Sequence, residues 1–526
     1  MARAESAGWL SDFRVRHHIS GQLTQMILAG GVALVVLVAA VVALPRSSTK
    51  TATHATSPGN DANGLTNETS GSGSNVAGAG AAGGRSPVGS AGSGGSQVGA
   101  VGPGMTAPLP GGGHVSSRFI AAKAPGITKT TIYIAEPYNS EEVNAADRAI
   151  GAAGAAASYD RRNVFNAAAD YANKHGGFAG RVLKPIFFAY NATDGSDTQD
   201  QSACAYWTQD NKVFVIDGVF GAILQSCAEK AHAVAFGGAA TAAEYKRYPH
   251  LIDPIAIRLD RLARLTVNGL YRAHYFAGKL GMVTWDDPSY REVMKGSYLP
   301  TLAKLGVKVT DTSYIYVPQE IQALGDMTAN VSSAVAKFKS EGIDHVIIQD
   351  GPAGVFGGTG LTLEWMDQAK SQRYYPRYGQ NTGNSPGWDV LPSDQMDHAI
   401  AIDHADYDKK FDVGWHTNAE REKCFKIEAD AGYPVNSSNL NDEVAAGESC
   451  DTVFFLQRVL NGGISLITND SFISAAEQLG TSFHSAVVYG SKLVPGRRDG
   501  GGMMRSEEYF DSCKCLKFIS SPAYSD

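Results

Sequence analysis

One pentapeptide carries the residue types of a serine nucleophile. Gly383-Asn384-Ser385-Pro386-Gly387 matches the G-x-S-x-G elbow, in which the backbone N–H after the serine stabilises an oxyanion. Proline has no backbone N–H, so Pro386 removes that donor. The common zinc patterns, H-E-x-x-H and paired C-x-x-C, do not occur in the sequence. A polar cluster at His398, Asp403, His404, Asp406 and Asp408 is typical of a solvated loop. We therefore expect no enzyme, no cofactor and no metal site.

Two glycine-rich stretches have some features of phosphate-binding loops. Residues 78–83 read G-A-G-A-A-G, a formal G-x-G-x-x-G, but no strand precedes them and no helix follows. Residues 351–358 (GPAGVFGG) follow an apolar run and precede a helical pattern, yet they lack the Gly-Lys-Ser/Thr of a P-loop. Neither stretch predicts a nucleotide site.

Length and charge limit the remaining classes of function. The chain has 526 residues, enough for two or three domains. Lys plus Arg total 45 against 52 for Asp plus Glu, a net charge of −7, which argues against a nucleic-acid partner. The six cysteines all lie at or beyond Cys204, and their even number suits disulfides in an oxidising compartment.

The N-terminal region predicts a membrane anchor. Residues 26–44 contain no charge and as a helix would span ~28 Å, close to the hydrocarbon thickness of a bilayer. Residues 1–25 would be a cytoplasmic tail, and residues 45–116, rich in Gly, Ser and Ala, a disordered, flexible linker. The expected location is the cell membrane, single-pass, with the rest of the chain extracytoplasmic. A cleaved signal peptide, with Val41 and Ala43 before the cut, is the alternative.

Beyond the linker, short apolar runs alternate with helical patterns. The helix expected at 163–174 has Val164, Phe165 and Ala168 on one face, and a second is expected at 451–461. This alternation predicts an α/β fold with parallel sheets covered on both faces. The expected strands are 131–135, 186–190, 213–217, 233–236, 280–285, 313–317, 345–349 and 399–403.

Four stretches, in this order, resemble type I periplasmic binding proteins of the leucine/isoleucine/valine-binding type. They are Tyr171–Gly180 with its Asn-x-x-Gly-Gly turn, Gly238–Tyr245, Lys279–Val283 continuing to Asp287 and Tyr290, and Lys337–Asp344. The resemblance extends from about Thr128 to the C-terminus.

The resemblance implies two doubly wound lobes joined by three crossing strands, near Ile257–Asp260, Asp403 and Val487–Tyr489. Within the domain at 117–526, one lobe would comprise about 117–258 and 404–487, and the other about 259–403 and 488–526. Such proteins close on a small solute, and those of ABC transporters deliver it to a permease. We expect a solute-binding monomer with no nucleic-acid partner.

The resemblance also implies ligand positions in the first lobe. Ala239 and Thr241 match the two positions of the fourth strand-to-helix loop that hold an amino-acid carboxylate with N–H and hydroxyl groups. Thr241 equally suits a helix N-cap without a ligand. Gly221 and Ala222 stand where the family has a serine-rich loop, so only backbone N–H groups are available at Ala222.

In the second lobe, Tyr290 matches the aromatic residue that covers the solute, with Asp287 beside it. The family's ammonium-binding glutamate corresponds to the Gln380-Asn381 region, where a carboxylate is missing. Glu136, Asp287 or Asp350 could substitute for it. The solute therefore stays open between an amino acid, an amide and a more neutral polar molecule.

Two disulfides are expected, Cys204–Cys227 and Cys424–Cys450, each joining cysteines of the first lobe; the first pairing is not inherited from the family. Cys513 and Cys515, in the expected final strand, could form a link or remain a thiol pair.

Three functions remain besides transport. A sensor or receptor would use the fold without a permease, and an enzyme would turn over the bound solute. A surface protein with a degenerate cleft would bind none, and the hydroxyl missing at Ala222 and the glutamate missing near Asn381 leave this possibility open.

Overall fold

The computed structural model describes residues 119–140, 160–191, 196–219, 221–238, 240–320, 323–353, 359–383, 391–405, 418–436, 440–521 and 523–524. The expected tail (1–25), transmembrane helix (26–44) and linker (45–116) lie outside these residues, and so does Ala239. Among the helices that the structure does describe, none has both the length and the hydrophobicity that crossing a membrane requires.

Five parallel strands form the first sheet, in the order β3-β2-β4-β5-β6, within the described part of the chain. Their bounds are β2 Thr131–Asn139, β3 Val182–Tyr190, β4 Val215–Ile216, β5 Val234–Phe236 and β6 Leu251–Ile252. Ile132 and Ile134 of β2 belong to one buried apolar cluster, and Ala135 belongs to another on the opposite face. Burial on both faces is the condition that near-continuous apolar runs predict for a parallel sheet.

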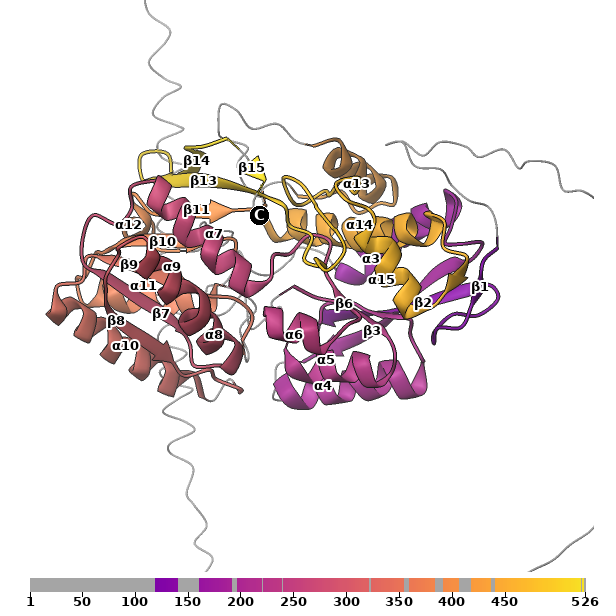
Figure 1. Cartoon of the computed structure of the whole chain (residues 1–526), viewed down its shortest axis with the longest axis horizontal. Helices are drawn as coiled ribbons and strands as arrows, with labels where there is room; N and C mark the ends of the chain where they lie inside the picture. The colour runs from indigo at the N-terminus through magenta and orange to yellow at the C-terminus, as the bar shows by residue number, and fades with distance from the viewer. Residues whose placement is uncertain are drawn as a thin grey trace, which may run out of the picture. The chain divides into compact units, whose positions relative to one another are not determined.

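Helices cover both faces of the first sheet (Figure 1). On one face, α3, α14 and α15 supply Phe165, Phe455 and Phe472 to a shared apolar cluster. On the other, η1, a π-helix, and α5 supply Trp207 and Leu224. The bounds are α3 Arg161–Lys174, α4 Ser196–Ala205, η1 Tyr206–Asp210, α5 Ala222–Lys230, α6 Ala242–Arg247, α13 Ala419–Asp430, α14 Leu440–Asn461 and α15 Asn469–Glu477. A short parallel pair, β1 Ala121–Ala122 and β12 Leu466–Ile467, lies outside the sheet.

The second sheet has the order β14-β13-β11-β10-β9-β7-β8, with β15 paired to β13. The strands from β11 to β8 are mutually parallel, whereas β13 is antiparallel to β11, β14 and β15. The bounds are β7 Leu280–Trp285, β8 Val309–Ile315, β9 His345–Gln349, β10 Arg377–Asn381, β11 Ile400–Asp403, β13 Met503–Phe510, β14 Cys515–Phe518 and β15 Ala523–Tyr524.

Small residues let helices approach this sheet closely. A Cβ at Gly269 of α7 would meet the Ile402 side chain of β11 at 2.7 Å, and one at Gly281 of β7 would meet Phe338 of α10 at 2.3 Å. Both positions therefore exclude larger residues unless the neighbouring side chain moves. The helices are α7 Leu259–Arg272, α8 Pro288–Val293, η2 Met294–Tyr298 (a π-helix), α9 Leu299–Lys304, α10 Leu324–Glu341, α11 Gly360–Ser371 and α12 Ser393–Met396.

The chain passes between the two sheets after β6, after β11 and before β13. Of the passage after β11, the structure describes only residues 404 and 405 before it resumes at Asn418. Isolated bridges join Asp253 to Asp499 and Ala405 to Val488, so the third segment contacts each of the other two. The crossing points expected from the family lie on or beside these segments, while the lobe boundaries stay a prediction.

All six cysteines form disulfides: Cys204–Cys227, Cys424–Cys450 and Cys513–Cys515. The first two are the pairings expected from the sequence. Cys513 lies in the turn between β13 and β14 rather than in a strand, which corrects the expected placement of this cysteine in the final strand.

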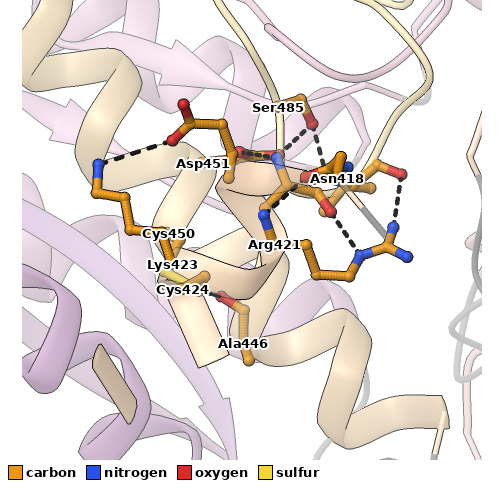
Figure 2. The surroundings of a disulfide bond; sticks show 11 residues. Asn418, Arg421, Lys423, Cys424, Ala446, Cys450, Asp451 and Ser485 are labelled. Atoms are coloured by element: carbon orange, nitrogen blue, oxygen red, sulfur yellow. Dashed lines mark hydrogen bonds and ion pairs between the residues drawn. A yellow bond between two sulfur atoms is a disulfide. The ribbon is translucent and has the colours of Figure 1, made fainter. Parts of the chain in front are cut away.

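The Cys424–Cys450 disulfide joins α13 to α14 beside the third connecting segment (Figure 2). From α13, Arg421 donates from Nε to the Ala486 carbonyl at 2.9 Å. From α14, Asp451 accepts from the Ala486 N–H at 2.7 Å and from the Ser485 hydroxyl. The cross-linked helix pair therefore holds this connecting segment from two sides.

We predict that replacing Cys424 and Cys450 by alanine lowers the free energy of unfolding by about 3–4 kcal/mol. The two cysteines are 26 residues apart in sequence. In the chain-entropy model, a disulfide across such a loop lowers the conformational entropy of the unfolded chain and stabilises the folded state by this free energy. Guanidinium denaturation measures it.

Replacement of Cys513 and Cys515 by alanine is the control. These two cysteines have a sequence separation of only 2, so the loss of free energy of unfolding should be much smaller. Equal losses in the two double variants would contradict the loop-length explanation.

Candidate functional site

Acidic residues gather at the carboxyl ends of the first sheet. Ile134 pairs with Val215 and Ala135 with Ile216, so Glu136, within β2, lies beside Asp217, the residue that follows β4. Asp253 directly follows β6 in the same parallel sheet. Ligands of open α/β sheets bind beyond the carboxyl ends of the strands. These acids therefore lie at the edge where a solute site is expected.

Glu136 is fully buried and only half satisfied. Its Oε1 atom accepts from Nε of Arg161 at 2.9 Å, whereas Oε2 has no hydrogen-bond partner among the described residues. Burial raises the pKa of Glu136 well above its ordinary value, and the nearby Asp217 charge adds to the rise. Arg161 also contacts Glu448 of α14, Nη1 to Oε2 at 3.5 Å. One guanidinium thus contacts two carboxyl groups.

The neighbouring acids have better-defined partners. Asp217 accepts from the Gly218 N–H at 2.9 Å and from the Thr452 hydroxyl at 3.0 Å. Asp253 accepts from the N–H groups of Ile255 and Ala256, both at 2.9 Å. Burial nevertheless raises the pKa of Asp253 to about 7, and repulsion from neighbouring carboxylates contributes. We refer to Glu136, Asp217, Asp253, Glu448 and Arg161 as the acidic cluster.

Thr241 forms the N-cap of α6 in a complete capping box. Its Oγ1 accepts from the Glu244 N–H at 3.2 Å, and its own N–H donates to Glu244 Oε2 at 2.7 Å. The other oxygen of Glu244 accepts from the Ser289 hydroxyl of α8 at 3.1 Å. A solute carboxylate at Thr241 would therefore have to displace the Glu244 carboxylate. The ligand role of Thr241 stays a prediction.

Ala222 is the exposed first residue of α5. The preceding Gly221 has φ +86°, and no side chain caps this helix start. Backbone N–H groups are the donors that this turn offers, as expected from the missing hydroxyl. Ala239 lies outside the described residues, so its predicted role has no structural counterpart here.

Tyr290 and Asp287 belong to the start of α8. Tyr290 is only 3 % exposed, packs in the core of the second sheet and donates from its hydroxyl to the Pro352 carbonyl at 3.2 Å. Asp287 caps the helix by accepting from the N–H groups of Ser289 and Tyr290. Both side chains have structural partners, and their binding roles stay predictions.

Asn381 and Asp350 follow or end neighbouring strands of the second sheet and are buried. The Asn381 amide donates to the Tyr298 hydroxyl at 3.0 Å and accepts from the Gly383 N–H at 2.8 Å. Asp350 accepts four hydrogen bonds of 2.8–3.0 Å, from Trp285 Nε1, the Gly351 N–H, and the N–H and hydroxyl of Thr362. The Asp350 carboxyl is therefore saturated by the protein itself.

One group among the described residues brings together three donor atoms of the kinds that bind metals. Atoms of Cys424, Glu428 and Cys450 lie within 4.8 Å of one another. The two sulfurs are joined in the disulfide of Figure 2, so neither is a thiolate that could ligate zinc. Glu428 is buried without a hydrogen-bond partner in the described structure, and burial raises its pKa to about 8.

Sequence reasoning named Glu136 but missed the rest of the acidic cluster. A usable signal was present for two members, because Asp217 and Asp253 each directly follow an apolar strand. Glu448 and Arg161 belong to helices distant in sequence, and no local pattern marks them. The N-cap alternative at Thr241 is confirmed, and the Thr241-x-x-Glu244 spacing is the capping-box signal that would have added Glu244.

We predict that the protein becomes more stable as the pH falls from 7.5 to 5.5. Burial raises the pKa of Asp253, Asp350 and Asp451 to about 7 and that of Glu428 to about 8. Through this window the folded state holds protons that the unfolded chain has released, so acidification favours folding. Burial lowers the pKa of His404 to about 3, which acts in the opposite direction, but it is one group against four.

Urea denaturation at pH 5.5, 6.5 and 7.5 checks this dependence. The midpoint should be highest at pH 5.5. A midpoint that is constant or rises with pH would show that these carboxyl groups ionise normally in the folded state.

No protein-family model matches the chain, and no curated protein matches it significantly in sequence. Solved structures do match in fold. A branched-chain amino acid ABC transporter protein from Thermus thermophilus, with bound valine, is similar with a TM-score of 0.54 and 13% identity, covering 77% of this chain and 98% of its own.

A fatty acid ABC transporter substrate-binding protein from Thermomonospora curvata has a TM-score of 0.53 and 14% identity, covering 77% of this chain and 95% of its own. A solute-binding protein of an ABC transporter from Rhodopseudomonas palustris HaA2, in complex with p-hydroxybenzoic acid, has a TM-score of 0.52 and 13% identity, with coverages of 75% and 98%. Together with the two parallel sheets and their three connecting segments, these matches establish that the chain has the type I periplasmic binding protein fold.

Proposed function

We propose that this protein is a membrane-tethered, extracytoplasmic solute-binding protein that captures a small polar solute, of amino-acid or amide-like size, for an ABC-type transporter. The observation that carries the proposal is the fold itself. Each sheet has its own apolar core and forms, with its helices, one body of the domain. The parallel strands β6 and β11 run from their carboxyl ends directly into segments that connect the two bodies. Similar folds belong to substrate-binding proteins of ABC transporters.

To capture a solute in this way, the two bodies must be able to move relative to each other, and the bound solute must favour one of their arrangements. A ligand that contacts both bodies favours the state in which both sets of contacts are made. One direct contact between them joins α6 to α8, through Ser289 and Glu244. A second joins Ser196 to Gln319, side chain to side chain at 2.9 Å. Hydrogen bonds of this exposed kind contribute little individually, which suits a reversible closure.

The disulfides support a location outside the cytoplasm. Cytosolic thiols are kept reduced, whereas exported proteins retain structural disulfides. The anchor and linker that would tether the protein belong to residues 26–116. The disulfides therefore support export of the domain, and the sequence of residues 26–116 supports its attachment to the membrane.

A second candidate function is a surface protein with a degenerate cleft. The specific observation in its favour is the capping box, since the Glu244 carboxylate takes the Thr241 N–H, one of the two donors that the family would offer to a solute. A receptor of the same fold without a permease would bind a solute in the same way as the transport protein, so binding measurements separate the degenerate cleft from both.

We predict that at least one small polar solute raises the thermal unfolding midpoint of the purified protein. The panel contains amino acids, amides, urea and aromatic acids. A ligand at 100 times its dissociation constant adds about 2.7 kcal/mol to stability because it binds only the folded state. Differential scanning fluorimetry gives the midpoint, and calorimetry gives the affinity.

With a stabilising solute in hand, Thr241→Ala and Tyr290→Ala test the family-derived positions. Unchanged affinity in both variants would remove these residues from the site. A panel without any stabilising member would favour the degenerate cleft over solute capture.

A further inference from the structure

We infer that the solute carries a positively charged group, an ammonium or guanidinium, and that the acidic cluster binds it. The inference rests on the proposed solute-binding function and specifies the chemistry of the same site. The cluster surrounds the carboxyl ends of β4 and β6, with Glu136 on β2 beside the end of β4, and solutes of this architecture bind beyond the carboxyl ends of the strands. The family resemblance placed an anion-binding site in this lobe, so the inference reverses the expected polarity.

Charge balance is the first reason. The acidic cluster contains four carboxyl groups and one guanidinium, that of Arg161. Arg161 contacts Glu136 and Glu448 and its charge also acts on Asp217, so one cation serves three carboxyl groups, while the hydrogen bonds of Asp253 come from two neutral N–H groups. Buried carboxylates without a counter-charge are costly, and a cation within a few ångströms reduces that cost. A positively charged ligand therefore binds where the protein has left negative charge uncompensated.

The state of Glu136 is the second, independent reason. Its Oε2 atom is buried and receives no hydrogen bond from a donor group of the described residues, although Oε1 is paired with Arg161 and the carboxyl of Asp217 lies within reach of the side chain. Of the other two acids considered for an ammonium, Asp350 is buried and accepts four hydrogen bonds, two on each oxygen. Asp287 is only partly buried and accepts two N–H groups of α8 on Oδ1. Of the two buried acids, Glu136 is therefore the one that retains an acceptor for a ligand's N–H.

The surroundings of Thr241 disfavour the opposite choice, an anionic solute. The Thr241 N–H donates to the Glu244 carboxylate, which also accepts from Ser289, while the Thr241 hydroxyl oxygen accepts from the Glu244 N–H. A solute carboxylate would meet the negative charge of Glu244 there and would face the acidic cluster across the same sheet edge. Like charges at such separations disfavour binding.

A shared proton between Glu136 and Asp217 is the competing explanation. Burial and the Asp217 charge raise the pKa of Glu136, so a proton can stand in for a ligand cation. In that case the pair is structural and no ligand is needed. Neutralising Glu136 distinguishes the two explanations, because it preserves the neutral state but removes the charge that a cation would use.

The test compares Glu136→Gln with Glu428→Gln in the full-length protein. Both acids are fully buried with a raised pKa and an unpartnered oxygen, but Glu428 lies beside the Cys424–Cys450 disulfide. Glutamine keeps the shape of the side chain and an oxygen for Arg161. Denaturant unfolding confirms that both variants fold. The probes are putrescine and agmatine as cations, 1,4-butanediol as their neutral analogue, p-hydroxybenzoate as an anion, and calcium.

We predict that putrescine or agmatine raises the unfolding midpoint of the unmodified protein and that 1,4-butanediol and p-hydroxybenzoate do not. Glu136→Gln should weaken cation binding at least tenfold in titration calorimetry, whereas Glu428→Gln should leave it within about twofold.

Several outcomes would overturn the inference while leaving solute binding intact. These are stabilisation by p-hydroxybenzoate or a neutral solute without any by the organic cations, a response to calcium alone, or an unchanged cation affinity in Glu136→Gln. No response to any of these probes would also overturn it. If the earlier panel of amino acids and amides were likewise without effect, the proposed function would fail with it.

Discussion

A buried ion pair between Arg261 and Asp499 fixes the place where the two sheets are connected. Arg261 belongs to α7, and its Nε donates to Asp499 Oδ2 at 2.7 Å, while the Arg258 N–H donates to the same oxygen at 3.2 Å. Asp499 also forms a bridge with Asp253, which follows β6. Both charged side chains are almost fully buried, so loss of either partner would leave an uncompensated charge. This ion pair and the bridge therefore hold the first and third connecting segments against each other.

A buried carboxyl group needs hydrogen-bond or ion-pair partners, and the buried acids differ in how far the protein supplies them. Asp350 and Asp451 receive hydrogen bonds from donors of their own body and hold loops in place. Glu136 receives one guanidinium contact and leaves an oxygen unused. Unsatisfied groups in native structures are rare enough to need an explanation. At the carboxyl ends of a parallel sheet, a ligand is the explanation that the architecture favours, whereas Glu428 beside the disulfide has no such location.

Apolar periodicity was sufficient to predict most of the fold. Each of the eight strands expected from the sequence overlaps a strand of the structure, and the run at 280–285 coincides with β7, whereas β6 and β10 were not expected. The antiparallel strand β13 was missed because Met503–Phe510 contains Arg505, Glu507 and Glu508 and does not look apolar. The acidic cluster could be predicted only in part, because Arg161 and Glu448 come from helices that meet the sheet through tertiary packing. The role of Thr241 depended on Glu244, three residues away, and on Ser289 of another helix.

A fold of this kind constrains the solute much less than the few polar residues at its strand ends do. At 13% identity, likeness of fold leaves the ligand-contacting residues free to differ. A solute with a carboxylate needs donors directed at an anion. Here the Thr241 N–H at the start of α6 is taken by the Glu244 carboxylate, and the neighbouring strands supply carboxyl groups. In the site that we propose, selectivity, which is a difference between affinities, comes from repelling anions as much as from attracting cations.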